Sequence, residues 1–283
     1  MPTTNYNPIP RDSDENNASE ARYISAILAQ SGEFTDPGPR IRAMRNPVLF
    51  DHFTYGAGAF NSHVPQDWVT TETGAATPFA PGAAALGGLA VGVTGATTNN
   101  AEEIAGKNVG WKPSTMGGIY FECRAKFVSA TTATDGDFYM GLADAVTYTN
   151  GLPFVFSAAT AVTTDVPTEW VGFGYTSIAT SGAGFNAAGN SVGLVNCTSG
   201  TAVFTAPTDA GTTAVKDSLF HIYRVEVSTA GTATFYRDGK HVGSKASAVV
   251  ATTGLTPYIV ANAKASHAQT ATIDWIGVGA TYV

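Results

Sequence analysis

The stretch Gly118–Ser129, GIYFECRAKFVS, decides the fold class, because apolar and polar residues alternate along it. Successive side chains of a β-strand point to opposite faces. One face would carry the apolar set Ile119, Phe121, Cys123, Ala125 and Phe127. The other face would carry Tyr120, Glu122, Arg124 and Lys126. The pattern predicts a half-buried strand whose apolar face lies against a core.

The same period of two recurs further along the chain. Leu219–Ser228 and Thr232–Arg237 alternate in this way, and Asp238-Gly239 predicts a hairpin turn before a strand at Lys240–Val242. The closing run Thr270–Val283 predicts a strand with Ile273 and Trp275 on one face. Weaker patterns predict strands at Val48–Tyr55, Trp68–Glu72, Leu89–Thr94, Asp137–Ala143, Glu169–Tyr175 and Val192–Asn196.

Two Gly- and Ala-rich stretches, Thr73–Gly88 and Ala179–Asn190, predict long surface loops. About ten to fourteen strands, almost no helical periodicity and no linker after residue 50 predict one all-β sandwich over residues 48–283.

Composition narrows the function classes. The chain has 283 residues, 44% of them hydrophobic and only 13% charged, with a net charge of −7. A net negative charge provides no overall positive electrostatic field that would attract nucleic acid. We see no signal peptide and no apolar run of about 18 residues, so we expect a protein made in a cytoplasm that does not span a membrane. Cys123 and Cys197 are the two cysteines, and the sequence leaves open whether they pair.

The first 47 residues differ from the rest and predict an extended arm. Residues 1–16 are polar and proline-containing, and residues 33–47 contain Pro37, Pro39 and Pro47. Between them, residues 17–30 predict one short amphipathic helix, with Asn17 as its cap. Such a helix is marginal alone and needs a surface to lie against. That surface is either the arm's own sandwich or a neighbouring molecule, and we favour the neighbour.

The residues expected to contact that neighbour are of two kinds. The apolar ones are Tyr23, Ile24, Ile27 and Leu28, and the basic ones are Arg40, Arg42 and Arg45. An alternative for the arginines is a solvated segment in which interleaved acids balance their charge.

Several strand motifs resemble a known superfamily. The run HIYRVEVSTAGTATFYRDGKHVGS, residues 221–244, resembles a hairpin typical of concanavalin-A-like jelly-roll domains. The closing TATIDWIGVGATY resembles the last strand of laminarinase- and lectin-type members. LFDHFTYG followed by VPQDWVT is similar to the entry of such domains in phage virion proteins. The resemblance covers about half of residues 48–283 and implies an all-β jelly-roll of two antiparallel sheets.

The resemblance also says what an enzyme of this superfamily requires. Its hydrolases carry Glu-x-Asp-x-Glu on one strand, where alternate positions place the carboxylates on one face. This sequence has no such triplet; its nearest acidic cluster is Asp135-Gly-Asp137. We therefore expect no catalytic residues and no enzyme activity.

Metal binding is also disfavoured by the sequence. Asp135, Asp137 and Asp144 could supply oxygens to calcium, but polar turn residues are the simpler interpretation. The five histidines, His52, His63, His221, His241 and His267, have no metal-ligand spacing. We expect no metal site and no cofactor.

Two functions remain. The first is a capsid decoration (cement) protein of a tailed phage, located on the outer capsid. It would bind the major capsid protein through the arm and itself as a dimer or trimer. The second is a carbohydrate-binding module in which Trp170 and Tyr175, with Phe173, Tyr148 and Phe154 nearby in sequence, line a saccharide platform. Aromatic residues at strand spacing are more often core residues.

Overall fold

The computed structural model describes residues 48–51, 68–81, 88–97, 100–107, 110–129, 136–145, 154–158, 161–164, 168–176, 192–205, 218–263 and 267–280. These ranges lie in one compact unit, Val48–Val283. The predicted arm at residues 1–47 lies outside the described residues, with its helix at 17–30 and its proposed contact residues. The predicted loop Ala179–Asn190 lies outside them as well.

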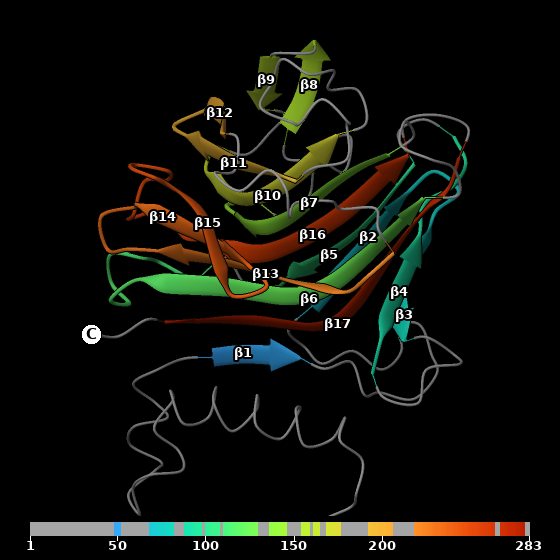
Figure 1. The fold of residues 1–283 in the computed structure, drawn as a ribbon, viewed down its shortest axis with the longest axis horizontal. Helices are drawn as coiled ribbons and strands as arrows, with labels where there is room; N and C mark the ends of the chain where they lie inside the picture. Colours follow the sequence, from blue (N-terminus) through green and yellow to red (C-terminus); the bar gives the residue numbers. More distant parts are fainter. Residues whose placement is uncertain are drawn as a thin grey trace, which may run out of the picture. The chain divides into compact units, whose positions relative to one another are not determined.

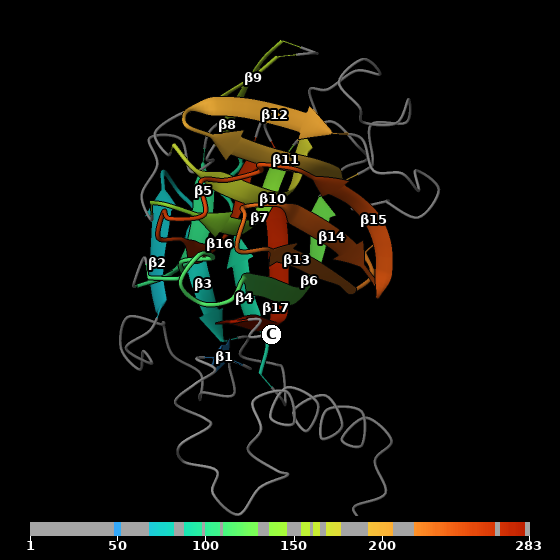
Figure 2. The same ribbon diagram turned by 90° about the vertical axis from the view of Figure 1, so that its left-hand side faces the viewer.

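Two antiparallel sheets form most of the part of the chain that the structure describes (Figures 1 and 2). The eight-stranded sheet has the order β15-β14-β13-β6-β17-β4-β3, and β1 also pairs with β17. Its strands are β1 (Val48–Asp51), β3 (Thr77–Pro81), β4 (Ala90–Val93), β6 (Ile119–Ser129), β13 (His221–Val227), β14 (Ala233–Arg237), β15 (Lys240–Lys245) and β17 (Gln269–Ala280).

The seven-stranded sheet has the order β12-β11-β10-β7-β16-β5-β2. Its strands are β2 (Trp68–Thr73), β5 (Ala101–Gly106), β7 (Gly136–Ala143), β10 (Trp170–Thr176), β11 (Gly193–Thr198), β12 (Thr201–Thr205) and β16 (Thr256–Ala263). A separate hairpin pairs β8 (Phe154–Ala158) with β9 (Ala161–Thr164). The chain crosses repeatedly from one sheet to the other, for example between β6 and β7 and between β16 and β17, as a jelly-roll sandwich requires.

The main core lies between the sheets. The predicted apolar face of β6 is confirmed, because Ile119, Phe121, Cys123, Ala125 and Phe127 are all buried in this core. Phe127 meets Phe138 of β7 with ring centroids 4.2 Å apart, so the two central strands contact directly across the sandwich. The prediction of an all-β jelly-roll is confirmed.

The predicted face of the last strand is half wrong. A bulge in β17 between Ile273 and Trp275 leaves Asp274 without a cross-strand partner on β6. Ile273 points into the core, but Trp275 is the partner of Arg124 on the opposite face. The extra residue shifts the alternation by one position, and Ile276 returns to the core.

Six strands were missed by the sequence reasoning. β3 lies inside Thr73–Gly88, so the prediction of a continuous loop there is wrong. The others are β5, β8, β9, β12 and β16. β5 and β16 are buried on both faces, so their sequences, AEEIAG and TPYIVANA, lack the alternation of a half-exposed strand.

Candidate functional site

The outer face of the seven-stranded sheet carries a second apolar cluster, separate from the core between the sheets. This outer aromatic cluster consists of Ala101, Ala105, Tyr139, Ala143, Trp170, Val195, Cys197, Tyr258 and Val260. Tyr139 is its centre, with ring centroids 6.0 Å from both Trp170 and Tyr258. All three rings are fully buried. A face that points away from the main core is therefore packed like a core itself.

Two glycines make room for the centre of this cluster. Gly141 of β7 and Gly172 of β10 are direct partners across the sheet. A Cβ atom on Gly141 would lie 2.9 Å from the Tyr139 hydroxyl oxygen and 2.3 Å from the Val171 carbonyl oxygen. The Tyr139 hydroxyl occupies this space and donates a hydrogen bond to the Leu142 carbonyl at 2.7 Å. Glycine in a strand here permits a close approach of backbone and ring.

Buried polar groups lie on the same face. Asp137 and Asn262 are cross-strand partners on β7 and β16, and both are fully buried. Glu103 of β5 is 2% exposed and is hydrogen-bonded to the Tyr258 side chain. Burial raises the pKa of Glu103 to about 8, opposed in part by that hydrogen bond. Sequence reasoning missed Glu103, Tyr139 and Tyr258, because the face of a strand depends on a register that the sequence does not display.

The two residues expected to share a saccharide platform do not share a face. Trp170 belongs to the outer aromatic cluster, whereas Tyr175 belongs to the core between the sheets, where it contacts Phe138 at 5.8 Å. An odd sequence separation along one strand places two side chains on opposite faces. Both are fully buried. Phe173 lies in the core, Phe154 begins β8, and Tyr148 lies outside the described residues.

The carboxylate spacing of the hydrolase pattern is absent from the described strands. Within them, no strand carries two acidic residues separated by one position, the spacing that the hydrolase pattern requires. The described part of the chain also contains no group of three or more His, Cys, Asp or Glu side chains placed to hold a metal. No described helix is long and apolar enough to cross a membrane.

The structure places both cysteines and two of the three aspartates that were considered as calcium ligands. Cys123 lies in the core and Cys197 in the outer aromatic cluster, and the two are not joined by a disulfide. Burial raises the pKa of the Cys123 thiol well above its ordinary value. Asp144 accepts hydrogen bonds from the Thr168 amide and hydroxyl and from the Glu169 amide. Its role is to join the end of β7 to the start of β10. Asp135 lies outside the described residues.

Glu169, just before β10, joins three segments. Its Oε1 accepts the Ser199 amide at 2.7 Å, and its Oε2 accepts the Val250 amide at 2.7 Å. The Asn196 side chain donates to the Ala248 carbonyl at 3.0 Å nearby. These bonds hold the turn between β11 and β12, and the loop between β15 and β16, against the edge of the sandwich.

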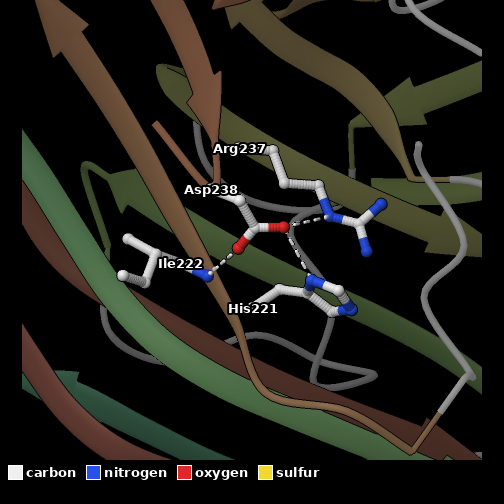
Figure 3. Close-up of polar contacts among 4 residues, drawn as sticks. All are labelled: His221, Ile222, Arg237 and Asp238. Carbon is white, nitrogen blue, oxygen red and sulfur yellow. Dashed lines mark hydrogen bonds and ion pairs between the residues drawn. The ribbon is translucent and has the colours of Figure 1, made fainter. Parts of the chain in front are cut away.

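The turn between β14 and β15 contains a second polar cluster, shown in Figure 3. Asp238 has a positive φ of 49°, and its carboxyl oxygens accept from the Ile222 amide at 2.9 Å and contact His221 Nδ1 at 2.7 Å. The buried Arg237 side chain approaches it with Nε at 3.8 Å. The contacts with His221 and Ile222 tie the hairpin to the start of β13, which is a structural role.

The outer face of the eight-stranded sheet is covered by paired charges. Arg224 contacts Glu122 at 3.2 Å and Glu226 at 2.7 Å, and its guanidinium lies 4.7 Å from the Tyr120 ring centre. Arg124 pairs with Asp274. Burial raises the pKa of Glu122, while the charge of Arg224 opposes that shift. This face is a neutralised network in which each arginine already has a partner.

Comparison with known proteins identifies the fold. No family model matches the chain. No curated protein matches it either. An endo-1,3-β-glucanase from Streptomyces sioyaensis superposes with a TM-score of 0.55 at 12% identity, covering 83% of this chain and 96% of the glucanase.

Two further solved structures give similar values. A protein of unknown function from Shewanella oneidensis MR-1 has a TM-score of 0.51 at 13% identity, over 87% of this chain and 95% of that one. A glycoside hydrolase family 16 endo-glucanase from Bacteroides ovatus has a TM-score of 0.50 at 10% identity, covering 81% of this chain and 99% of the endo-glucanase. Identities this low establish the fold alone. The chain therefore has the concanavalin-A-like jelly-roll fold that its strand motifs predicted.

Proposed function

We propose that the chain is a non-catalytic structural protein of a virion, a capsid decoration protein that attaches through its N-terminal arm. The observation that carries this proposal is the closed outer aromatic cluster. Trp170, Tyr139 and Tyr258 are fully buried on the face where an open sheet would present rings to a ligand. A sandwich packed on that face serves as a rigid block better than as an open cleft.

The arm supplies the attachment in this proposal. Tyr23, Ile24, Ile27 and Leu28 would bury apolar area on the major capsid protein, at about 2 kcal/mol for each aliphatic side chain fully buried. Arg40, Arg42 and Arg45 would pair with capsid carboxylates. The sandwiches would then meet as dimers or trimers on a capsid axis, where repetition strengthens each weak contact.

Deletion of residues 1–47 is expected to abolish binding to undecorated phage heads, because the arm carries the anchoring contacts. Co-sedimentation of the full chain and the deleted chain with heads measures this. Arg40, Arg42 and Arg45 replaced together by Ala should weaken binding at least tenfold, whereas Arg11→Ala, a control at the start of the arm, should not. Full-strength binding by the deleted chain would refute the attachment role.

Carbohydrate binding is the second candidate. It is favoured by the side-chain set on the outer face of the seven-stranded sheet, where aromatic rings lie beside the polar groups of Glu103, Asp137 and Asn262. The likeness to an endo-1,3-β-glucanase supports a glucan as the first ligand to test. Because Trp170 is buried, such binding requires that this face become accessible.

If this second function holds, the full chain should bind soluble β-1,3-glucan or another sugar on a glycan array, with or without calcium. Trp170→Ala should remove the signal, whereas Tyr236→Ala, an aromatic substitution on the other sheet, should keep it. Circular dichroism checks that both variants fold. If the wild-type chain gave no binding signal with any glycan, this candidate function would be excluded.

A further inference from the structure

β5 carries two adjacent carboxyl groups that the fold buries on opposite faces of the seven-stranded sheet. Glu102 is fully buried between the sheets, and Glu103 is 2% exposed on the outer face. Burial of an ionised carboxyl group is costly unless a cation or several hydrogen bonds compensate it. Whether cations or hydrogen bonds compensate the charge of this pair therefore decides how the stability of the strand depends on pH.

Glu102 reaches across the sandwich to the other sheet. Its Oε1 accepts the backbone amide of Ala271 on β17 at 3.3 Å, and its Oε2 has no partner among the described residues. Gly92 of β4 makes room for it, since a Cβ there would lie 2.7 Å from the Glu102 carboxyl carbon. Across its own sheet, Glu102 faces Ala261 on β16 and the exposed Glu72 on β2. None of these groups is a cation.

Glu103 is placed in the same way on the other face. It lies between Thr71 of β2 and Val260 of β16 in the register, with Tyr258 and Asn262 flanking Val260. Beyond them, β7 presents Tyr139 and Asp137. Glu103 is hydrogen-bonded to Tyr258, and its Oε2 has no partner in the part of the chain that the structure describes. Here too the described groups that face the carboxyl group include acids and phenols, and none of them is a cation.

We infer that β5 is a protonation latch: the sandwich holds Glu102 and Glu103 as neutral carboxylic acids, and their ionisation loosens β5 from β17 and β16. The free energy of unfolding is therefore expected to be largest in mildly acidic solution. This inference concerns the sandwich itself and does not depend on which partner the arm meets.

The direction of the pH effect follows from the two carboxyl groups. Burial raises the pKa of Glu102 well above 4.5, and it raises that of Glu103 to about 8. Between those pH values the folded chain holds protons that the unfolded chain has released, so the free energy of unfolding falls as pH rises. The stabilisation is complete below about pH 4.5 and is lost as pH rises through about 8.

Urea unfolding of the full chain between about pH 5 and about pH 8 tests the latch. The folding equilibrium constant should fall with rising pH by up to about tenfold per pH unit for each carboxyl group. Glu103→Gln should remove one such dependence and should be more stable than the wild type near pH 8. Glu72→Gln, on the exposed partner position of β2, should keep the wild-type dependence. A Glu103→Gln chain with the wild-type dependence would overturn the inference.

A second measurement needs no variant. In carbon-13 spectra of the wild-type side-chain carboxyl groups, Glu102 and Glu103 should titrate well above the ordinary glutamate value of about 4.3, with the pKa of Glu103 at about 8. Titration of every glutamate near that ordinary value would also overturn the inference.

Discussion

Gly172→Ala is expected to prevent stable folding, with a loss of more than about 4 kcal/mol in the free energy of unfolding. A Cβ atom at this position would lie 2.3 Å from the Met140 carbonyl oxygen and 2.9 Å from the Cα of Gly141. Both obstacles are backbone atoms of the central strand β7, so no side-chain rotation can relieve the clash. The strands would have to separate beneath the outer aromatic cluster. Soluble yield and urea unfolding measure the effect.

The control for this prediction is another glycine. Gly110 is exposed, and a Cβ there would meet nothing within 4 Å, so Gly110→Ala should stay within about 0.5 kcal/mol of the wild type. Equal stability of the two variants would show that β7 and β10 are less tightly packed than the structure indicates.

Glu169→Ala is expected to cost about 4 kcal/mol. The substitution leaves the amides of Ser199 and Val250 without their acceptor, at about 1–3 kcal/mol for each group that stays buried, and it leaves a cavity. It also releases two loops that are distant in sequence. Urea unfolding should show the loss, and hydrogen exchange at Ser199 and Val250 should accelerate.

Glu169→Gln distinguishes hydrogen bonding from packing. The amide keeps the shape and one acceptor oxygen, so about half of the loss should return. Glu72→Ala removes an exposed glutamate and should change stability by less than about 0.5 kcal/mol. A loss below about 1 kcal/mol in Glu169→Ala would mean that the loops are held by their apolar contacts alone.

Much of the sandwich could be predicted from short-range patterns. Strands that face a core on one side and water on the other can be recognised from the alternation of apolar and polar residues, as in β6 and β13. The Asp238-Gly239 turn lies where its residue types require it, with positive φ at both positions. The strand motifs also indicated the jelly-roll fold that the comparisons identify.

The candidate site could not be predicted in the same way. β5 and β16 are buried on both faces, so alternation does not mark them, although they position Glu103 and Tyr258. Trp170 and Tyr175 are close in sequence, but their side chains leave opposite faces of β10, which closeness in sequence does not reveal. Strict alternation places Trp275 on the same face as Ile273, because no local signal in the sequence marks the bulge at Asp274.

By itself, the sequence determined that the chain forms strands, where most of the half-exposed strands lie and which of their faces are apolar. These properties follow from the alternation of side chains along a single strand and from turn residues with fixed backbone preferences. Tertiary structure alone decided that the aromatic rings on the outer face of the seven-stranded sheet are buried, that Glu102 and Glu103 are buried with no cation among the described groups facing them, and that Gly141 meets Gly172. Those properties depend on the register between strands distant in sequence, and register is set by packing over the whole sandwich.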